Sequence, residues 1–170
     1  MRNLMTIGLS FALAAGAVGQ DIPSVGPQEA LAMLNNPSSY LVDVRSVAEY
    51  TLVGHPVSAF NVPFEFWSES RSTFEPNTGF IDDLKSRFKL DDTLIFICRG
   101  GGRSLRAAEA ALTAGFRKCV NVKEGFEGEM DDSGKRTIRG WKNLGLPWTQ
   151  KIDSKLAYPF RAAGFFSPSL

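Results

Sequence analysis

The sequence predicts an α/β domain built on a parallel β-sheet, and three observations support this fold class. Short apolar runs alternate along the chain with segments of helical periodicity. A glycine-rich turn follows the most apolar of these runs, where a strand gives way to a helix. Hydrophobic residues make up 44% of the 170 residues and charged residues 22%, a composition that builds one ordinary globular core. Strands that alternate with helices favour parallel pairing, because each helix returns the chain across the sheet.

Composition also excludes several classes of function. The chain has 19 Lys and Arg against 18 Asp and Glu, a formal net charge of +1, whereas a nucleic-acid-binding domain usually has a clear basic excess. Its one histidine, His55, and its two cysteines, Cys98 and Cys119, cannot form a closed zinc site from Cys and His alone. Two cysteines are also too few for a disulfide-dense scaffold. We therefore expect no nucleic-acid partner and no metal.

The first 19 residues have the pattern of a secretory signal peptide. A basic residue, Arg2, precedes an uncharged run over residues 4–18 that ends in small residues. This run is short for a membrane span, which needs about 20 apolar residues. We expect cleavage after Ala17 or Gly19, and hence a periplasmic or secreted protein. The alternative is an uncleaved segment that keeps the chain in contact with a membrane.

Four short apolar runs are the expected strands. They cover residues 40–44, 59–63, 93–97 and 119–122, and the third is the most apolar. Runs of this length without polar alternation are typical of parallel strands that are buried on both faces. Periodicity fails over residues 64–77, which we expect to form an aromatic-rich excursion above the domain.

Segments between these strands have the spacing and end signals of helices. A proline suits a first helical position, a Ser-x-x-Glu pair forms a capping box, and Gly115 suits a left-handed helix end. The expected helices are residues 27–34, a short helix opened by Ser46 and Glu49, residues 79–90, residues 104–114, and a short helix around Trp141.

The glycine-rich turn is the candidate for chemistry. It lies where an open α/β sheet normally places its ligand site, and its sequence is Cys98-Arg99-Gly100-Gly101-Gly102-Arg103-Ser104. Three successive glycines let the backbone fold around Cys98 with several amide N–H groups pointing inward. The following helix N-terminus, Arg99 and Arg103 add positive charge. We expect Cys98 to be a nucleophile that is partly or wholly ionised at neutral pH, the alternative being a structural turn around a small buried hydrophobe.

This turn resembles the Cys-Arg-x-Gly-x-Arg-Ser active-site loop of the single-domain rhodaneses, the thiosulfate sulfurtransferases. Other parts of the sequence agree in the same order, namely Leu41-Val42-Asp43-Val44-Arg45 with Glu49-Tyr50, Gly54-His55 before Ala59-Phe60-Asn61-Val62-Pro63, and Gly140-Trp141-Lys142 with Gly145-Leu146-Pro147. The resemblance implies a single rhodanese-like domain over residues 22–150, an open parallel sheet flanked by helices on both faces. Residues 151–170 are then a C-terminal extension.

The resemblance also implies a sulfurtransferase that needs no metal or organic cofactor. Cys98 is then the nucleophile, which takes a sulfane sulfur from thiosulfate or a similar small anionic donor and becomes a persulfide. The acceptor is a thiol, a cyanide-like nucleophile or a redox partner protein. Asp43 and Arg45 are supporting residues that either orient the loop or pair with each other. The implied substrate-binding residues are Arg99, Gly100, Gly101, Gly102, Arg103 and Ser104.

Two other functions are compatible with the same loop. A persulfide carrier holds sulfur mainly for handover to a partner protein and turns over poorly with small molecules. A cysteine phosphatase of this fold has a Cys-x5-Arg loop that is sized for phosphate. The loop from Cys98 to Arg103 is one residue shorter, which favours sulfur over phosphorus.

The remaining polar features have structural interpretations. We expect His55 to be a hydrogen-bonded structural residue, since a buried polar ring normally finds a partner. Cys119 opens a strand whereas Cys98 closes one, so in a parallel sheet they lie further apart than the ~7 Å that a disulfide tolerates. The acidic segment 125–139 is expected to be solvated, with calcium binding as the alternative. The aromatic tail, residues 155–170, packs onto the domain, touches a membrane or meets a partner.

Overall fold

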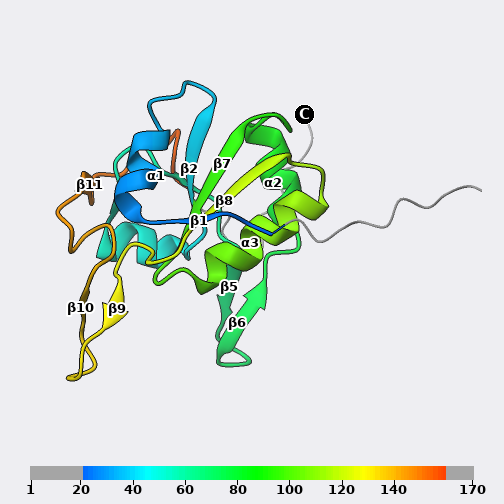
Figure 1. Cartoon of the computed structure of the whole chain (residues 1–170). Coiled ribbons are helices and arrows are strands. Elements are labelled where there is room, and N and C mark those ends of the chain that lie inside the picture. The colour runs from blue at the N-terminus through cyan, green and yellow to red at the C-terminus, as the bar shows by residue number, and fades with distance from the viewer. Residues whose placement is uncertain (1–20, 160–170) are drawn as a thin grey trace, which may run out of the picture.

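The computed structural model describes residues 21–159 (Figure 1). Its centre is a five-stranded sheet in the order β1-β8-β7-β2-β4, in which all neighbouring strands are parallel. The strands are β1 (Ser24–Val25), β2 (Ser39–Asp43), β4 (Phe60–Asn61), β7 (Thr93–Ile97) and β8 (Lys118–Val122). The predicted parallel sheet is therefore confirmed.

The three long strands align at both ends. Ser39 of β2 is level with Thr93 of β7, and Thr93 is level with Lys118 of β8. Their carboxyl ends consequently reach the same edge of the sheet, which is the edge where open α/β folds bind ligands. Cys98 is the first residue after β7 and therefore lies at that edge.

Helices cover both faces of the sheet (Figure 1). Two separate apolar clusters show which helix covers which face. One cluster holds the buried residues of α2 (Phe80–Arg87) and α3 (Gly102–Thr113), and the other holds Ala30 of α1 (Pro27–Met33). The expected arrangement, with helices on both faces, is confirmed.

These two clusters take alternate residues of β7. Leu94 and Phe96 pack with α2 and α3, whereas Ile95 and Ile97 pack on the side of α1. All four side chains are fully buried. A strand buried on both faces has no position for a polar side chain, which explains why this run is continuously apolar.

The helix that follows the glycine-rich turn, α3, packs a face of small residues on the sheet. Ala107, Ala108 and Ala111 are fully buried there. The helix begins at Gly102, two residues before its predicted start. Gly115, just beyond its end, has a φ of +102°, as the predicted left-handed cap requires.

The predicted capping box is present. Ser46 N–H donates to the Glu49 carboxylate at 3.0 Å, and Glu49 N–H donates to Ser46 Oγ at 3.2 Å. The element that follows is a single turn of π-helix, η1 (Glu49–Val53), rather than an α-helix. The box fixes the direction of the Glu49 side chain, because its carboxylate must reach back to Ser46.

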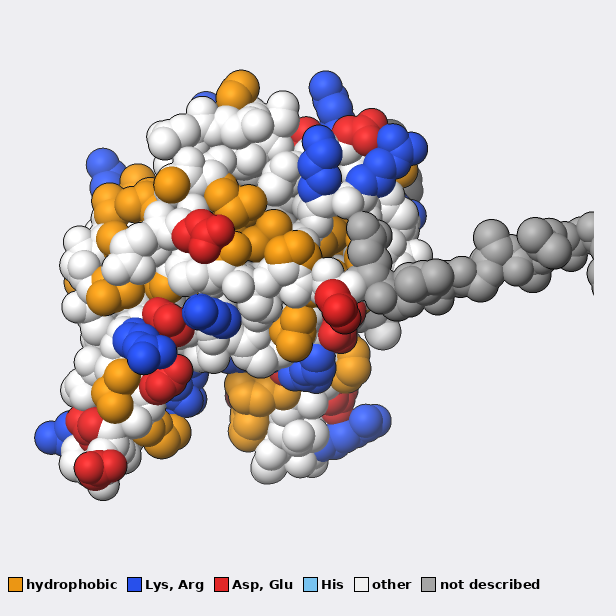
Figure 2. All heavy atoms as spheres, in the orientation of Figure 1, with side chains coloured by type: hydrophobic (Ala, Val, Ile, Leu, Met, Phe, Trp, Pro, Cys, Tyr) orange, Lys and Arg blue, Asp and Glu red, His pale blue; other side chains and the backbone are white. Residues whose placement is uncertain are grey.

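Two antiparallel hairpins project from the same side of the molecule (Figure 1). In one, β5 (Glu65–Ser68) pairs with β6 (Thr73–Pro76), and in the other β9 (Glu129–Met130) pairs with β10 (Arg136–Ile138). Figure 2 shows them as separate projections that display apolar as well as charged side chains. The sequence predicted an irregular excursion for the β5–β6 segment and an acidic surface loop for the β9–β10 segment. It did not predict the strand pairing in either segment.

The prediction of a short helix around Trp141 is wrong, because residues 141–145 form turns. Gly140 and Gly145 have φ values of +78° and +68°, which interrupt helical geometry on both sides. Trp141 is instead a core residue, whose indole N–H donates to the carbonyl oxygen of Pro147 at 2.9 Å.

A two-stranded sheet, β3 (His55–Pro56) with β11 (Trp148–Thr149), and the segment after β11 pack against the domain. β3 pairs with β11 in antiparallel fashion. The Asn61 N–H of the edge strand β4 donates to the carbonyl oxygen of Leu156 at 2.8 Å. Tyr158 donates its hydroxyl hydrogen to an α2 carboxylate at 2.8 Å. Of the three destinations left open for the tail, packing onto the domain is the one that residues 155–159 adopt.

The predicted signal peptide, residues 1–19, and the last part of the tail, residues 160–170, lie outside the described residues. Between residues 21 and 159, no helix is both long and apolar enough to cross a membrane. Export therefore stays a prediction from the sequence.

Candidate active site

Cys98 is the first residue after β7, and its sulfur receives two hydrogen bonds. The Gly101 N–H donates to Sγ at 3.1 Å and the Ser104 hydroxyl donates to it at 3.3 Å. The residue is only 2% exposed. Donors that point at a sulfur can stabilise negative charge that develops on it. The sequence predicted several inward amides, whereas within residues 21–159 one amide and one hydroxyl bond to Sγ.

Gly101 can direct its N–H at the sulfur because it has no side chain. Its φ is +102°, a region that residues with a Cβ rarely adopt. A Cβ at this position would also overlap the carbonyl oxygen of Lys123. The loop around Cys98 therefore requires glycine here for two independent reasons.

Backbone hydrogen bonds fix the outer side of the loop to the segment after β8. Phe126 N–H donates to the carbonyl oxygen of Cys98 at 2.8 Å, and Glu127 N–H donates to that of Arg99 at 2.9 Å. The backbone of Cys98 is thus held from one side and its sulfur from the other.

Ser104 connects the sulfur to the interior of the domain. Its Oγ lies 2.7 Å from Asn121 Oδ1 and 3.0 Å from the carbonyl oxygen of Gly101, in addition to Cys98 Sγ. The Asn121 amide in turn donates to Ser24 Oγ at 3.2 Å. Ser104 was predicted as a site residue and Asn121 was not. A polar residue inside the buried run 119–122 was the signal that could have revealed it.

Arg103 forms a two-pronged ion pair with Glu49. Arg103 Nη2 lies 2.6 Å from Glu49 Oε1 and Nη1 lies 2.9 Å from Oε2, and the side chains are 15% and 20% exposed. Burial raises the pKa of Glu49, but hydrogen bonds from Arg103 and Ser46 and the Arg103 charge outweigh it and hold that pKa at about 2. Much of the positive charge expected at Arg103 is therefore compensated. The sequence assigned Glu49 to capping alone.

Burial also acts on Arg103, in the opposite direction. It lowers the pKa of the guanidinium, whereas the hydrogen bonds and charge of Glu49, and more weakly the charge of Cys98, raise it above its ordinary value. Arg103 accordingly remains a cation beside the loop, with its charge shared between Glu49 and Cys98.

Arg99 extends along the surface toward Glu127. Its side chain is 48% exposed, and its Nε lies 3.7 Å from Glu127 Oε2. The other carboxylate oxygen of Glu127 lies 3.9 Å from the buried Nη1 of Arg45. Glu127 belongs to the segment that was interpreted as solvated surface, so this bridging role was missed.

Asp43 and Arg45 pair with each other, which is one of the two roles predicted for them. Arg45 Nη2 lies 2.6 Å from Asp43 Oδ2, and both side chains are fully buried. The same Nη2 donates to the carbonyl oxygen of Gly54 at 2.7 Å. Burial lowers the pKa of Arg45, but the charge of Asp43 and its hydrogen bonds outweigh this effect and raise the pKa. The pair fixes the end of β2 to the turn after η1.

Gly100 and Gly102 have different surroundings. Gly102 is exposed at the first position of α3, and a Cβ there would meet nothing within 4 Å. A Cβ at Gly100 would lie 3.0 Å from Nη1 of Arg136, a residue of β10. A third arginine therefore reaches the loop, and no motif in the sequence indicated it.

His55 and Cys119 have the structural roles expected of them. His55 is buried, its ring stacks on Tyr50 with 3.6 Å between centroids, and its Nδ1 lies 2.9 Å from the Tyr50 carbonyl oxygen. Cys119 is buried at the start of β8, and burial raises the pKa of its thiol to about 11. Both Cys98 and Cys119 are free thiols, so the predicted lack of a disulfide between them is confirmed.

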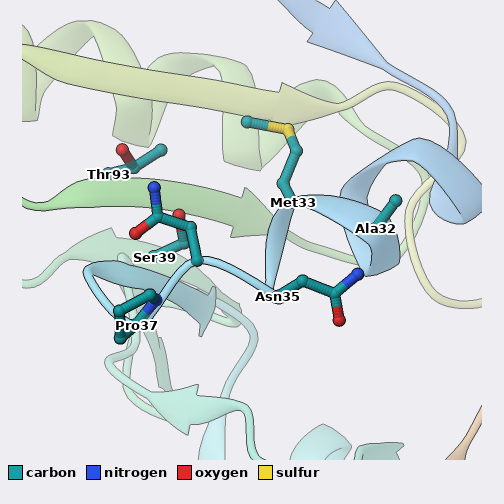
Figure 3. Close-up of a pocket in the computed structure, with 7 residues that line it drawn as sticks. Ala32, Met33, Asn35, Pro37, Ser39 and Thr93 are labelled. Carbon is teal, nitrogen blue, oxygen red and sulfur yellow. The ribbon is translucent and has the colours of Figure 1, made fainter.

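A hollow of about 600 Å³ lies at the opposite edge of the sheet from Cys98 (Figure 3). It is lined by the end of α1 and by Ser39 and Thr93, the first residues of β2 and β7. None of the predicted site residues contributes to it. Across the part of the chain that the structure describes, no three His, Cys, Asp or Glu side chains are grouped to hold a metal ion.

Two curated proteins are similar to this chain over most of its length. An uncharacterised protein from Rickettsia prowazekii (strain Madrid E) is 36% identical over 117 residues, which cover 68% of this chain and 86% of that protein. Thiosulfate sulfurtransferase 16, chloroplastic, from Arabidopsis thaliana is 30% identical over 106 residues, which cover 62% of this chain and 76% of that protein.

Solved structures and a family model match as well. The crystal structure of Rv0390 from M. tuberculosis shares 38% sequence identity with a TM-score of 0.67, and the match covers 78% of this chain and all of that one. The model of the rhodanese-like domain matches residues 26–130, from just before α1 to β9, and includes the whole loop around Cys98. The chain therefore belongs to the rhodanese-like domain family.

Proposed function

We propose that this protein is a sulfurtransferase in which Cys98 takes a sulfane sulfur from thiosulfate or a similar anionic donor and passes it to a thiophilic acceptor. Membership of the rhodanese-like family supports sulfurtransferase chemistry in general. The observation that carries the specific proposal is the pair of donors on Cys98 Sγ, the Gly101 N–H and the Ser104 hydroxyl. They stabilise the negative charge that Sγ carries as the attacking thiolate and regains when the outer sulfur leaves for the acceptor.

Both half-reactions balance without a cofactor. The Cys98 thiolate attacks the outer sulfur of thiosulfate, a new S–S bond forms, and sulfite leaves with the electron pair of the bond that breaks. A thiolate or cyanide then attacks the terminal sulfur of the persulfide, and the electron pair of that S–S bond returns to Cys98. The N-terminus of α3 and the remaining charge of Arg103 favour the anionic sulfur in each state.

Formation of thiocyanate from thiosulfate and cyanide tests the proposal. We expect turnover by the wild-type protein and a loss of roughly 10³-fold or more in Cys98→Ser, because the serine hydroxyl cannot form a persulfide. Cys119→Ser is the matched control and should retain activity, since Cys119 is the second residue of β8 and lies near the other edge of the sheet. Equal rates for Cys98→Ser and wild type contradict the proposal, and so does Cys98-dependent hydrolysis of p-nitrophenyl phosphate without thiocyanate formation.

A persulfide carrier is the second candidate, and one observation favours it. Glu49 and Glu127 compensate the two arginines of the loop, which weakens the attraction for a free anionic donor. A carrier accepts sulfur rapidly from a protein persulfide but turns over slowly with thiosulfate and cyanide. Steady-state rates with small molecules, compared with single-turnover loading from a persulfidated protein, separate the two candidates.

A further inference from the structure

The charge balance around the Cys98 loop differs from the one that its sequence suggests. Arg103 is paired with Glu49 and Arg99 lies 3.7 Å from Glu127, so each arginine of the loop lies within ion-pair distance of a carboxylate. An arriving anion competes with those carboxylates for both guanidinium groups. A cation without such a partner is therefore better placed to bind it.

Arg136 is a cation of this kind, and it lies against the loop. Its Nη1 is 3.0 Å and its Cζ 3.8 Å from the position that a Cβ on Gly100 would occupy. Among residues 21–159, no Asp or Glu oxygen comes within 4.0 Å of its guanidinium. Its Nε is buried and has no hydrogen-bond acceptor in the described structure. A buried charged donor without an acceptor lowers the stability of the fold, and an anion that accepts a hydrogen bond from it would remove this penalty.

The β9–β10 hairpin fixes Arg136 in this position. Arg136 Nη1 donates to the carbonyl oxygen of Gly128, at the base of the hairpin. Asn143 donates from its side-chain amide to the carbonyl oxygens of Glu127 at 2.9 Å and Arg136 at 3.3 Å. Glu127 also donates its backbone N–H to the carbonyl oxygen of Arg99, so hydrogen bonds join the base of the hairpin to the loop. The guanidinium is thus held in place before any ligand arrives.

Gly100 leaves the space that this guanidinium occupies. It precedes Gly101, whose N–H donates to Cys98 Sγ, so the cation lies beside the peptide unit that directs a donor at the sulfur. An anion with its reactive sulfur at Cys98 and its charged oxygens toward Gly100 would meet Arg136 directly.

From this arrangement, we propose that Arg136 is an anion-binding residue of the Cys98 loop that takes the oxygen-bearing end of thiosulfate or a similar oxyanion donor. The inference rests on the proposed function of Cys98, and it assigns the β9–β10 hairpin a role in choosing the donor. Removal of the guanidinium charge weakens reaction with anionic reagents and leaves reaction with neutral ones largely unchanged.

Alkylation of Cys98 by two reagents of different charge tests the assignment without requiring catalysis. Full-length wild type, Arg136→Gln and Arg136→Lys are treated with iodoacetate, an anion, or iodoacetamide, which is neutral, and modification of Cys98 is followed by peptide mass spectrometry. We expect the iodoacetate-to-iodoacetamide rate ratio to fall about tenfold in Arg136→Gln and less in Arg136→Lys. The control is Lys135→Gln, which removes an equal charge from an exposed position on the same hairpin and should change the ratio little.

Donor kinetics provide the second readout. In Arg136→Gln, the KM for thiosulfate rises about tenfold, while the rate at which a neutral phosphine removes the terminal sulfur from the preformed persulfide stays within about twofold of wild type. An unchanged reagent ratio in a variant with wild-type circular dichroism overturns the assignment. A lowered ratio without any persulfide formed from thiosulfate supports the anion site and refutes the sulfurtransferase proposal, so the two failures are distinguishable.

Discussion

Ser104 has more hydrogen-bond acceptors around it than its one hydroxyl hydrogen can serve. Cys98 Sγ, the Gly101 carbonyl oxygen and Asn121 Oδ1 all lie within 3.3 Å of its Oγ. A negative charge on the sulfur draws the hydrogen toward Sγ, because a charged acceptor forms the stronger hydrogen bond. Ser104 can therefore follow the charge state of Cys98 without any movement of the backbone.

Glu49 makes stability depend on pH in a defined range. Its pKa is about 2 in the folded protein against an ordinary value of 4.5, so the charged form stabilises the fold above pH 4.5 and that contribution disappears as the pH falls toward 2. Glu49→Gln should lower the free energy of unfolding by about 3 kcal/mol above pH 4.5 and by progressively less below it. Urea unfolding at a series of pH values measures this difference.

The matched control for that experiment is Glu69→Gln. Glu69 is an exposed carboxylate, and its side chain has no ion pair in the described part of the chain. Its substitution should leave the free energy of unfolding nearly unchanged across the same pH range. A pH-independent difference between wild type and Glu49→Gln would show that the ion pair with Arg103 does not hold the carboxylate in its charged form.

Sequence reasoning located the residues that lie next to one another in the chain and missed those that do not. Cys98 and Ser104 belong to one short loop, so their proximity follows from local geometry. Glu49 and Arg136 reach that loop from η1 and β10, and only the packing of the whole chain decides which carboxylate or cation faces which. Ion-pair partners of this kind leave no periodicity or spacing in the sequence.

At the level of elements, the buried core was predictable and the exposed hairpins were not. The strand over Thr93–Ile97 and the helix after it have apolar patterns that the core imposes. The β5–β6 hairpin instead displays Trp67 and Phe74 on its surface, so hydrophobicity gave no alternation to follow. The β9–β10 hairpin is short and its register shifts between Arg136 and Ile138. Such pairing depends on turn geometry more than on side-chain pattern.

The close contact between α3 and the sheet makes a specific prediction about stability. Ala111 is fully buried against the apolar cluster on that face, so Ala111→Leu adds volume where there is no space. We expect it to lower the free energy of unfolding by about 1–3 kcal/mol. Urea denaturation gives the value, with Ala110→Leu at the neighbouring, partly exposed position as the control. Equal effects of the two substitutions would argue against tight packing of this helix face.

In the molecule as a whole, the Cys98 loop and the hollow beside the end of α1 lie at opposite edges of the sheet. Cys98 lies where the parallel strands end, whereas the hollow of about 600 Å³ lies where β2 and β7 begin. The loop edge is formed by segments from distant parts of the chain, including η1, the start of α3, the residues after β8 and the β9–β10 hairpin. Parallel topology brings these segments together, since the strands all point to one edge.

The central claim is that Cys98 carries sulfur as a persulfide, and the intact mass of the protein after treatment with thiosulfate tests it most directly. The account predicts that wild type gains the mass of one sulfur atom, loses it on addition of cyanide, and that Cys98→Ser gains nothing. Cys119→Ser should gain and lose the sulfur as wild type does, because its substitution leaves the loop intact. A wild-type mass that thiosulfate leaves unchanged, or a sulfur that persists in Cys98→Ser, would contradict it.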